Sequence, residues 1–173
     1  MKKKHDFSVS FEGLSFGKHQ FQFVVNQDFF KEFEYDEVED AEVSVVVELE
    51  KQETMLTFDF TITGNVSVCC DRCCESYKQP IEGTYSLYIK FGEEYLEESD
   101  DVIVIPFKQH QFDFTHLIYE YIVLLLPLKK VHPNDKNNRS TCNEETIKKL
   151  QELEIQDDID SRWDKLRQID INK

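Results

Sequence analysis

Hydrophobic and polar residues alternate along most of the first half of the chain. Apolar residues recur with a period of two in four stretches: Phe7, Val9 and Phe11; Phe21, Phe23 and Val25; Val43, Val45, Val47 and Leu49; and Leu56, Phe58, Phe60 and Ile62. This alternation is typical of antiparallel strands that have one side in the core and the other in water. We therefore predict a strand in each stretch, with a hairpin turn at residues 51–53 and a short helix at 28–33.

The same alternation places a pair of cysteines near the tip of a hairpin. It continues through Val66 and Val68 to Cys70, and a further alternating stretch at residues 81–91 predicts the return strand. The turn between them contains the second cysteine, Cys73. Residues 102–105 predict one more short strand.

Helical spacing appears only in the second half of the chain. Apolar residues from Leu117 to Leu125 recur at intervals of three and four, Asp113 precedes them as a capping residue, and Pro127 ends the pattern. We predict a helix buried against the sheet and assign it no chemistry. Thr141 or Asn143 is expected to cap a second helix that runs to about Leu153.

These elements predict an α+β fold. We expect a mainly antiparallel curved sheet or partial barrel, with one buried helix and short C-terminal helices. The length of 173 residues fits one ordinary domain, which we place at residues 1–155. Residues 156–173 are expected to form a linker and a short amphipathic tail helix.

The charge of the chain favours basic partners. The formal net charge is −15, which opposes broad binding of nucleic acid because that affinity depends mainly on neutralised phosphates. Six of the nine residues from Glu93 to Asp101 are acidic. This segment is interpreted either as a solvated loop or as a docking surface for a basic partner.

Basic residues gather in two places, which are the candidate sites for contact with RNA. The first is the loop-like stretch after the buried helix, with Arg72 expected nearby, and the second is the tail. Their basic residues are Arg72, Lys129, Lys130, Lys136, Arg139, Arg162, Lys165 and Arg167, and the tail adds the aromatic Trp163. A cation beside an exposed aromatic ring is a workable site for phosphate and base contacts. For Trp163, docking onto the sheet is the favoured alternative.

Five cysteines and no secretory signal indicate a reduced, cytoplasmic protein. The longest apolar run is too short to span a membrane. Cys70 and Cys73, with His132 and Cys142, have the ligand types of a tetrahedral zinc site. Three interpretations stay open for these four residues: zinc binding, inert thiols, and a redox pair at Cys70 and Cys73. Cys69 and Cys74 are expected to be inert, since neighbours along a strand face opposite sides.

The sequence gives little support to catalysis. A redox-active pair usually lies at a helix N-terminus, whereas strands are predicted on both sides of Cys70 and Cys73. The chain shows no Ser-His-Asp set, phosphate-binding glycine loop or pair of catalytic carboxylates, and no small-molecule substrate is evident. We expect a protein that is not an enzyme.

Several spaced motifs resemble the YceD family, which is named for accumulation of the large ribosomal RNA subunit. They are Cys70-Asp71-Arg72-Cys73 after a strand, Pro80-Ile81-Glu82-Gly83, the acidic segment, Leu125-Leu126-Pro127, and Val131-His132-Pro133 leading to Cys142. The closing Arg162-Trp163-Asp164-Lys165-Leu166 is similar to the C-terminal motif of members from the Bacteroidetes.

The resemblance implies a non-enzymatic factor in the accumulation of large-subunit ribosomal RNA and in large-subunit assembly. The acidic composition then favours a basic ribosomal protein as partner, with ribosomal RNA as the other candidate. Many family members carry more cysteines after the Leu-Pro helix, where this chain has only His132 and Cys142. Two alternatives are a thiol-disulfide or redox-sensing protein and a zinc-stabilised interaction module unrelated to ribosomes.

Overall fold

The computed structural model describes residues 7–153, which form two compact units. The first unit, Met1–His132, contains every strand of the described chain, and the second, Pro133–Lys173, contains one described helix. The elements in order are β1 (Ser8–Ser10), β2 (Gly17–Asn26), α1 (Gln27–Glu32), β3 (Val38–Lys51), β4 (Met55–Cys69), β5 (Ser76–Gly92), β6 (Leu96–Ser99), β7 (Val102–Pro106), β8 (Gln111–Asp113), α2 (Thr115–Leu125) and α3 (Glu144–Leu153).

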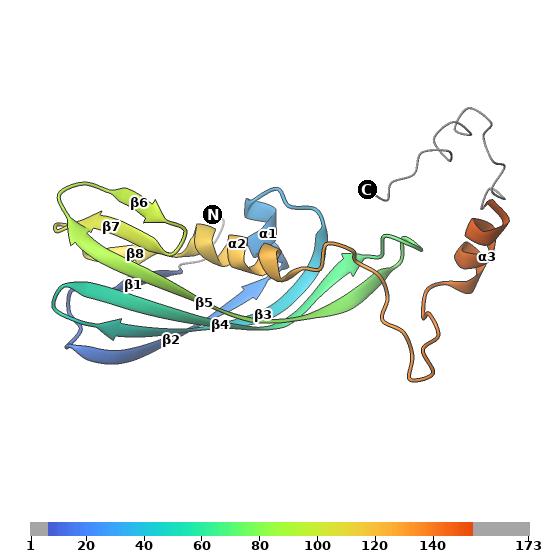
Figure 1. The fold of residues 1–173 in the computed structure, drawn as a ribbon, viewed down its shortest axis with the longest axis horizontal. Coiled ribbons are helices and arrows are strands. Elements are labelled where there is room, and N and C mark those ends of the chain that lie inside the picture. Colours follow the sequence, from blue (N-terminus) through green and yellow to red (C-terminus); the bar gives the residue numbers. More distant parts are fainter. Residues whose placement is uncertain (1–6, 154–173) are drawn as a thin grey trace, which may run out of the picture. The chain divides into compact units, whose positions relative to one another are not determined.

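A six-stranded sheet in the order β2-β3-β4-β5-β7-β6 dominates the first unit, as Figure 1 shows. Every pair in it is antiparallel except β5–β7, which is parallel. The predicted α+β class is confirmed. The sheet is open rather than closed into a barrel, and β1 and β8 form a separate two-stranded ribbon.

The alternation in the sequence sets which side of the sheet is buried. Val45 and Val47 of β3 are fully buried beside Ile62 and Phe60 of β4, with which they are in register. The intervening residues of both strands point to the other face and are exposed or half-buried. The sheet therefore has one apolar face, as the period of two predicts.

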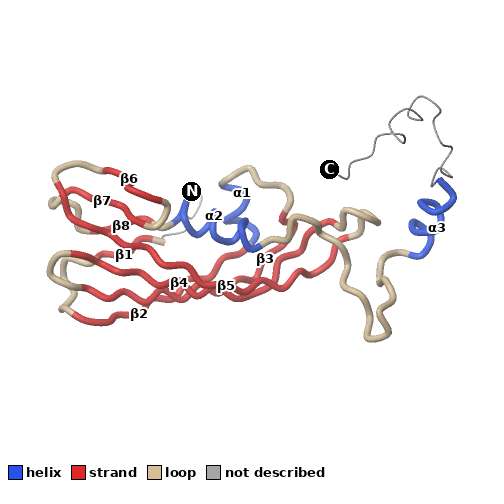
Figure 2. The backbone as a smooth tube through the Cα atoms, in the orientation of Figure 1, coloured by secondary structure: helices blue, strands red, loops and turns tan. Residues whose placement is uncertain are grey.

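Helices α1 and α2 lie together over the apolar face (Figures 1 and 2). Phe29 and Phe30 of α1 and Ile118 and Ile122 of α2 are fully buried. Helix α2 approaches β5 so closely that a side chain at Gly83 would overlap that of Leu125. The predicted buried helix is confirmed, and Asp113 bonds the first helical N–H, that of Thr115, at 2.8 Å.

The acidic segment 93–101 is not a loop throughout. Its residues 96–99 form β6, which within residues 7–153 pairs with β7 alone and stands at the end of the strand order. All four residues are exposed, so the sequence has no alternation of apolar and polar residues here that would predict a strand.

The second unit contains a polar loop and α3. Asn134 and Ser140 form an isolated antiparallel bridge, and Asn143 caps α3 by accepting hydrogen bonds from the N–H groups of Glu145 and Thr146. The predicted tail helix lies outside the described residues. Among the helices that the structure describes, none has the length and apolar character needed to cross a bilayer.

Candidate metal centre

The tip of the β4–β5 hairpin carries the two cysteines predicted there. Strand β4 ends at Cys69 and β5 begins at Ser76, and the turn is closed by two backbone bonds of 2.9 Å, from Cys70 N–H to Glu75 and from Cys74 N–H to Cys70. Cys74 has a left-handed φ of 58°, which reverses the chain into β5. As a result Cys70 and Cys73 are buried, whereas Cys69 and Cys74 are exposed.

The segment that follows α2 is attached directly to this tip. The N–H of Asp71 donates to the carbonyl of Lys130 at 2.7 Å, and the N–H of Lys130 donates to the Asp71 carboxylate at 2.6 Å. Asp71 stands between the two cysteines in the sequence. These reciprocal bonds therefore fix residues 130–132 beside the cysteine pair.

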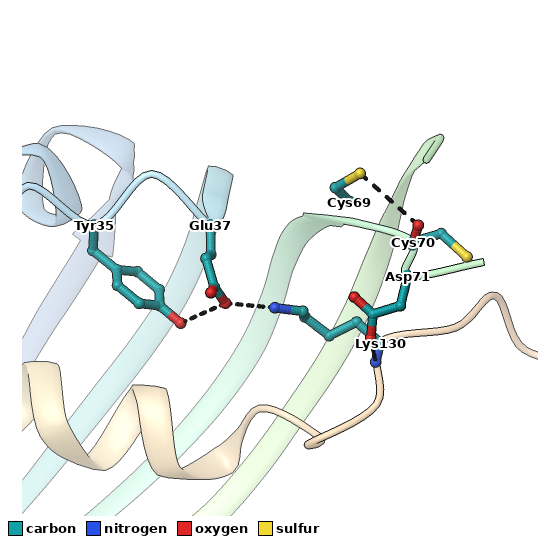
Figure 3. A network of polar contacts seen from close by, with 6 residues as sticks. All are labelled: Tyr35, Glu37, Cys69, Cys70, Asp71 and Lys130. Carbon is teal, nitrogen blue, oxygen red and sulfur yellow. Dashed lines mark hydrogen bonds and ion pairs between the residues drawn. The ribbon is translucent and has the colours of Figure 1, made fainter. Parts of the chain in front are cut away.

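A second interaction anchors the same segment to the loop before β3. Figure 3 shows the Lys130 ammonium bonded to the Glu37 carboxylate, which also accepts from the hydroxyl of Tyr35 at 3.0 Å. The hydrogen bond from Lys130 lowers the pKa of Glu37, and the same bond raises the pKa of Lys130. Both groups are therefore held in their charged forms.

His132 lies next to the cysteine pair. Its Nδ1 is 3.4 Å from the Sγ of Cys73, and its ring packs on Tyr77 at a centroid distance of 4.8 Å. The anchored backbone at Lys130 and the ring contact with Tyr77 both restrict the imidazole. The first unit thus places two thiols and one imidazole close to one another.

Cys142 is the fourth residue of this group. The potential ligand atoms of Cys70, Cys73, His132 and Cys142 all lie within 4.8 Å of one another, and the three thiols are buried. Three thiols and one imidazole are a donor set of structural zinc sites. The residues present fit that metal.

The surroundings of Cys70 favour its thiolate. Burial raises the pKa of this thiol, but hydrogen bonds from the backbone of Cys73, Arg72 and His132 outweigh it, and the pKa falls to about 6. The Arg72 N–H lies 3.4 Å from the Cys70 sulfur. Because the thiolate is the form that ligates metals, the turn prepares Cys70 for that role.

The predicted basic residues have different environments. Arg72 and Lys129 are exposed in the first unit, and Lys136 and Arg139 are exposed in the second. Lys130 differs, since its ammonium is paired with Glu37 and its side chain is only 17% exposed. Arg162, Trp163, Lys165 and Arg167 lie outside the described residues.

The residues that position the ligands were not predicted from the sequence. Asp71 was expected only as a turn residue. Its place between two cysteines was the signal that could have marked it as a residue that positions the ligands. Glu37 and Tyr77 gave no signal, because their roles depend on contacts across 93 and 55 residues of chain respectively.

Comparison with known proteins places these residues in a family. A family model described as "Large ribosomal RNA subunit accumulation protein YceD" matches residues 58–170, which include all four candidate ligands and more than half of the chain. No curated protein and no solved structure gives a significant match. The chain therefore belongs to the YceD family.

Proposed function

We propose that this protein is a non-enzymatic factor that supports accumulation of large-subunit ribosomal RNA and assembly of the large subunit. The observation that carries the proposal is the family match over residues 58–170. The factor would act by binding a basic large-subunit ribosomal protein or the RNA itself. The net charge of −15 favours the basic ribosomal protein as the partner, because the chain would repel RNA except at local basic patches.

Recovery of ribosomal components from lysate tests this proposal. Full-length tagged protein is expected to retain a large-subunit protein, large-subunit RNA, or both, at low salt. A second purification at higher salt separates the two forms of contact, because phosphate contacts weaken steeply with salt. Recovery of neither component at low salt would overturn the proposal.

We also propose that Cys70, Cys73, His132 and Cys142 bind a structural zinc ion. Their donor chemistry and their proximity support this assignment. Such an ion would link the β4–β5 tip to the polar loop after His132, a stretch with few buried apolar residues. Zinc binding would then contribute directly to the folding free energy of this region.

Metal analysis of protein purified without added zinc tests the metal proposal. We expect close to one zinc per chain, which is lost in Cys142→Ser and kept in the control Cys74→Ser, whose thiol is exposed. Metal-free protein with a reversible disulfide between Cys70 and Cys73 would instead support a redox role.

A further inference from the structure

A pocket of about 910 Å³ lies in the first unit, and carboxylates dominate its charged lining. The acidic residues come from the β6–β7 segment, from β8 and from α2: Glu97, Asp100, Asp101, Asp113 and Glu120. The lining includes no lysine or arginine, and its one histidine is His116. A pocket with this composition has a negative potential and will attract cations.

The carboxylates of the pocket differ in whether they already have hydrogen-bond or ion-pair partners. Glu97 accepts a hydrogen bond from Tyr95, Asp113 accepts one from the N–H of Thr115, and Glu120 lies 3.1 Å from the imidazole of His116. Within residues 7–153, no hydrogen bond or ion pair engages the carboxylates of Asp100 or Asp101. These two groups remain able to bind a cation. Glu120 remains able to do so as well, because its contact is with an exposed imidazole and is an ion pair only when His116 is protonated.

Tyr121 gives an independent indication of a ligand. Its side chain lines the pocket and is 93% buried, since only 7% of the residue is exposed. Its hydroxyl is buried and has no hydrogen-bond partner among the described residues. Buried hydroxyls are almost always bonded, so this one requires a partner that the described residues do not supply.

The environment of Tyr121 favours a cationic donor as that partner. Its ring stacks on Tyr85 at a centroid distance of 4.2 Å and an interplanar angle of 3°. Burial raises its pKa to about 12, with further contributions from the charges of Asp101 and Glu120. The hydroxyl therefore stays neutral and offers its lone pairs in a negative field.

A guanidinium group matches these features better than an ammonium. It is planar, can stack on an aromatic face, and presents five donors that can reach several acceptors at once. The rim is apolar and open, since Tyr95 is 53% exposed and Leu124 is 70% exposed. Such a rim suits the aliphatic part of a long side chain and the residues beside it.

We propose that this pocket binds an arginine side chain from a basic segment of a partner protein, with Asp101, Glu120 and Tyr121 as the groups that receive it. The proposal deepens the proposed function and rests on it for the identity of the partner as a basic ribosomal protein. The negative lining excludes RNA phosphate as the occupant.

A binding measurement with defined peptides tests the proposal. A fluorescently labelled peptide of alternating arginine and serine is titrated with the full-length protein, beside a lysine-serine peptide of equal length. We expect the arginine peptide to bind more tightly. Asp101→Asn combined with Glu120→Gln should weaken its binding by about 10-fold or more, because charge-assisted hydrogen bonds are lost.

A matched control removes the same charge elsewhere. Glu42→Gln combined with Glu48→Gln neutralises two exposed carboxylates of β3 and should leave the affinity nearly unchanged. Equal losses in the two double variants would overturn the proposal, since binding would then reflect net charge alone. Equal affinity of the pocket variant and the native protein would overturn it as well.

Tyr121→Phe provides a readout that a purely structural role would not give. Removing an unbonded buried hydroxyl should leave resistance to urea unchanged or increase it, while arginine-peptide affinity falls several-fold. Lower urea resistance with unchanged affinity would show that the hydroxyl serves the fold and would overturn its role in binding.

The lysate experiment separates the inference from the proposed function. If native protein and the Asp101/Glu120 double variant recover the same large-subunit components, the pocket is not the docking site and the proposed function stands. If native protein recovers none, the proposed function fails, and the peptide titration alone decides whether the pocket binds arginine. Tighter binding of an RNA oligomer than of the arginine peptide, lost in the pocket variant, would also contradict the proposal.

Discussion

Replacing Asp71 by alanine should weaken metal binding without removing a ligand. The Asp71 carboxylate accepts the Lys130 N–H at 2.6 Å and is the side-chain half of the reciprocal link that holds residues 130–132 at the hairpin tip. His132, two residues further on, should lose part of its restraint. The change therefore probes the positioning of a ligand rather than its chemistry.

The size of the effect follows from the bond that is lost. A hydrogen bond to a charged group contributes about 1.5–3 kcal/mol, which corresponds to a factor of about 10–100 in an equilibrium constant. Loss of residues that orient metal ligands typically lowers metal affinity by the same factor of about 10–100. We expect Asp71→Ala to reduce zinc affinity within this range.

Competition against a chromophoric chelator measures the affinity directly. Asp71→Asn keeps a carbonyl oxygen that can accept the Lys130 N–H, so it should retain most of the native affinity. Glu42→Ala, an exposed change on β3, serves as a control for loss of one negative charge. If Asp71→Ala binds zinc as tightly as the native protein, the link from Asp71 to Lys130 does not position His132, and the reasoning is wrong.

Three further predictions concern stability and are measured by chemical denaturation. Phe114 is fully buried against Phe58 and Phe60, at centroid distances of 4.8 and 5.2 Å, so Phe114→Ala should cost about 3–5 kcal/mol, and a loss below about 1 kcal/mol would contradict this packing. Gly83→Ala should cost less than about 1 kcal/mol, because the atoms it overlaps are the terminal methyls of the half-buried Leu125, which can move aside, and the cost should vanish in a Leu125→Ala background; a cost above about 2 kcal/mol would show that Leu125 is held in place. The pKa of Glu37 is lowered in the folded state, so the stability from its bond to Lys130 is present above the ordinary pKa of 4.5 and is lost as the pH falls below that value. Glu37→Gln should therefore lose less stability than the native protein over that acidic range. Parallel curves of unfolding free energy against pH for the two proteins would refute the assignment.

The main strands and the buried helix could be predicted because the spacing of apolar residues along the chain indicates which positions are buried. Val45 and Val47 alternate with less buried residues along one strand, and this period is local. Helix α2 could be located in the same way from its spacing of three and four. The place of Cys70 at a hairpin tip followed from counting along the alternation.

Other features could not be predicted because they depend on pairings between distant residues or on exposed strands. The parallel pairing of β5 with β7 joins two strands and leaves no pattern within either of them. The edge strand β6 has no buried residue, so it shows no alternation of apolar and polar residues. The contact of Lys130 with Glu37 joins residues 93 positions apart. Lys130 was grouped with the basic residues proposed to contact RNA, whereas its ammonium is engaged inside the first unit.

Helix α2 shows that a segment predicted to be core can also contain an unpartnered polar atom. Its apolar spacing predicted burial, and Ile118 and Ile122 are indeed fully buried. Tyr121 belongs to the same buried face, yet its hydroxyl requires a polar partner that the described core does not supply. Spacing reports which residues are buried but not whether their polar atoms are satisfied.

Strand β5 separates the hairpin tip from the acidic pocket by a calculable distance. It begins at Ser76, beside the cysteine turn, and Tyr85 lines the pocket nine residues later, which is about 30 Å at about 3.3 Å per residue. Sites this far apart that share no partner contribute to stability nearly additively. Changes at Asp71 should therefore leave arginine binding at Asp101 intact, because the sheet between them is held by continuous β4–β5 pairing from Cys69 to Met55. The fold thus keeps the residues that would bind metal apart from the residues that would bind a partner.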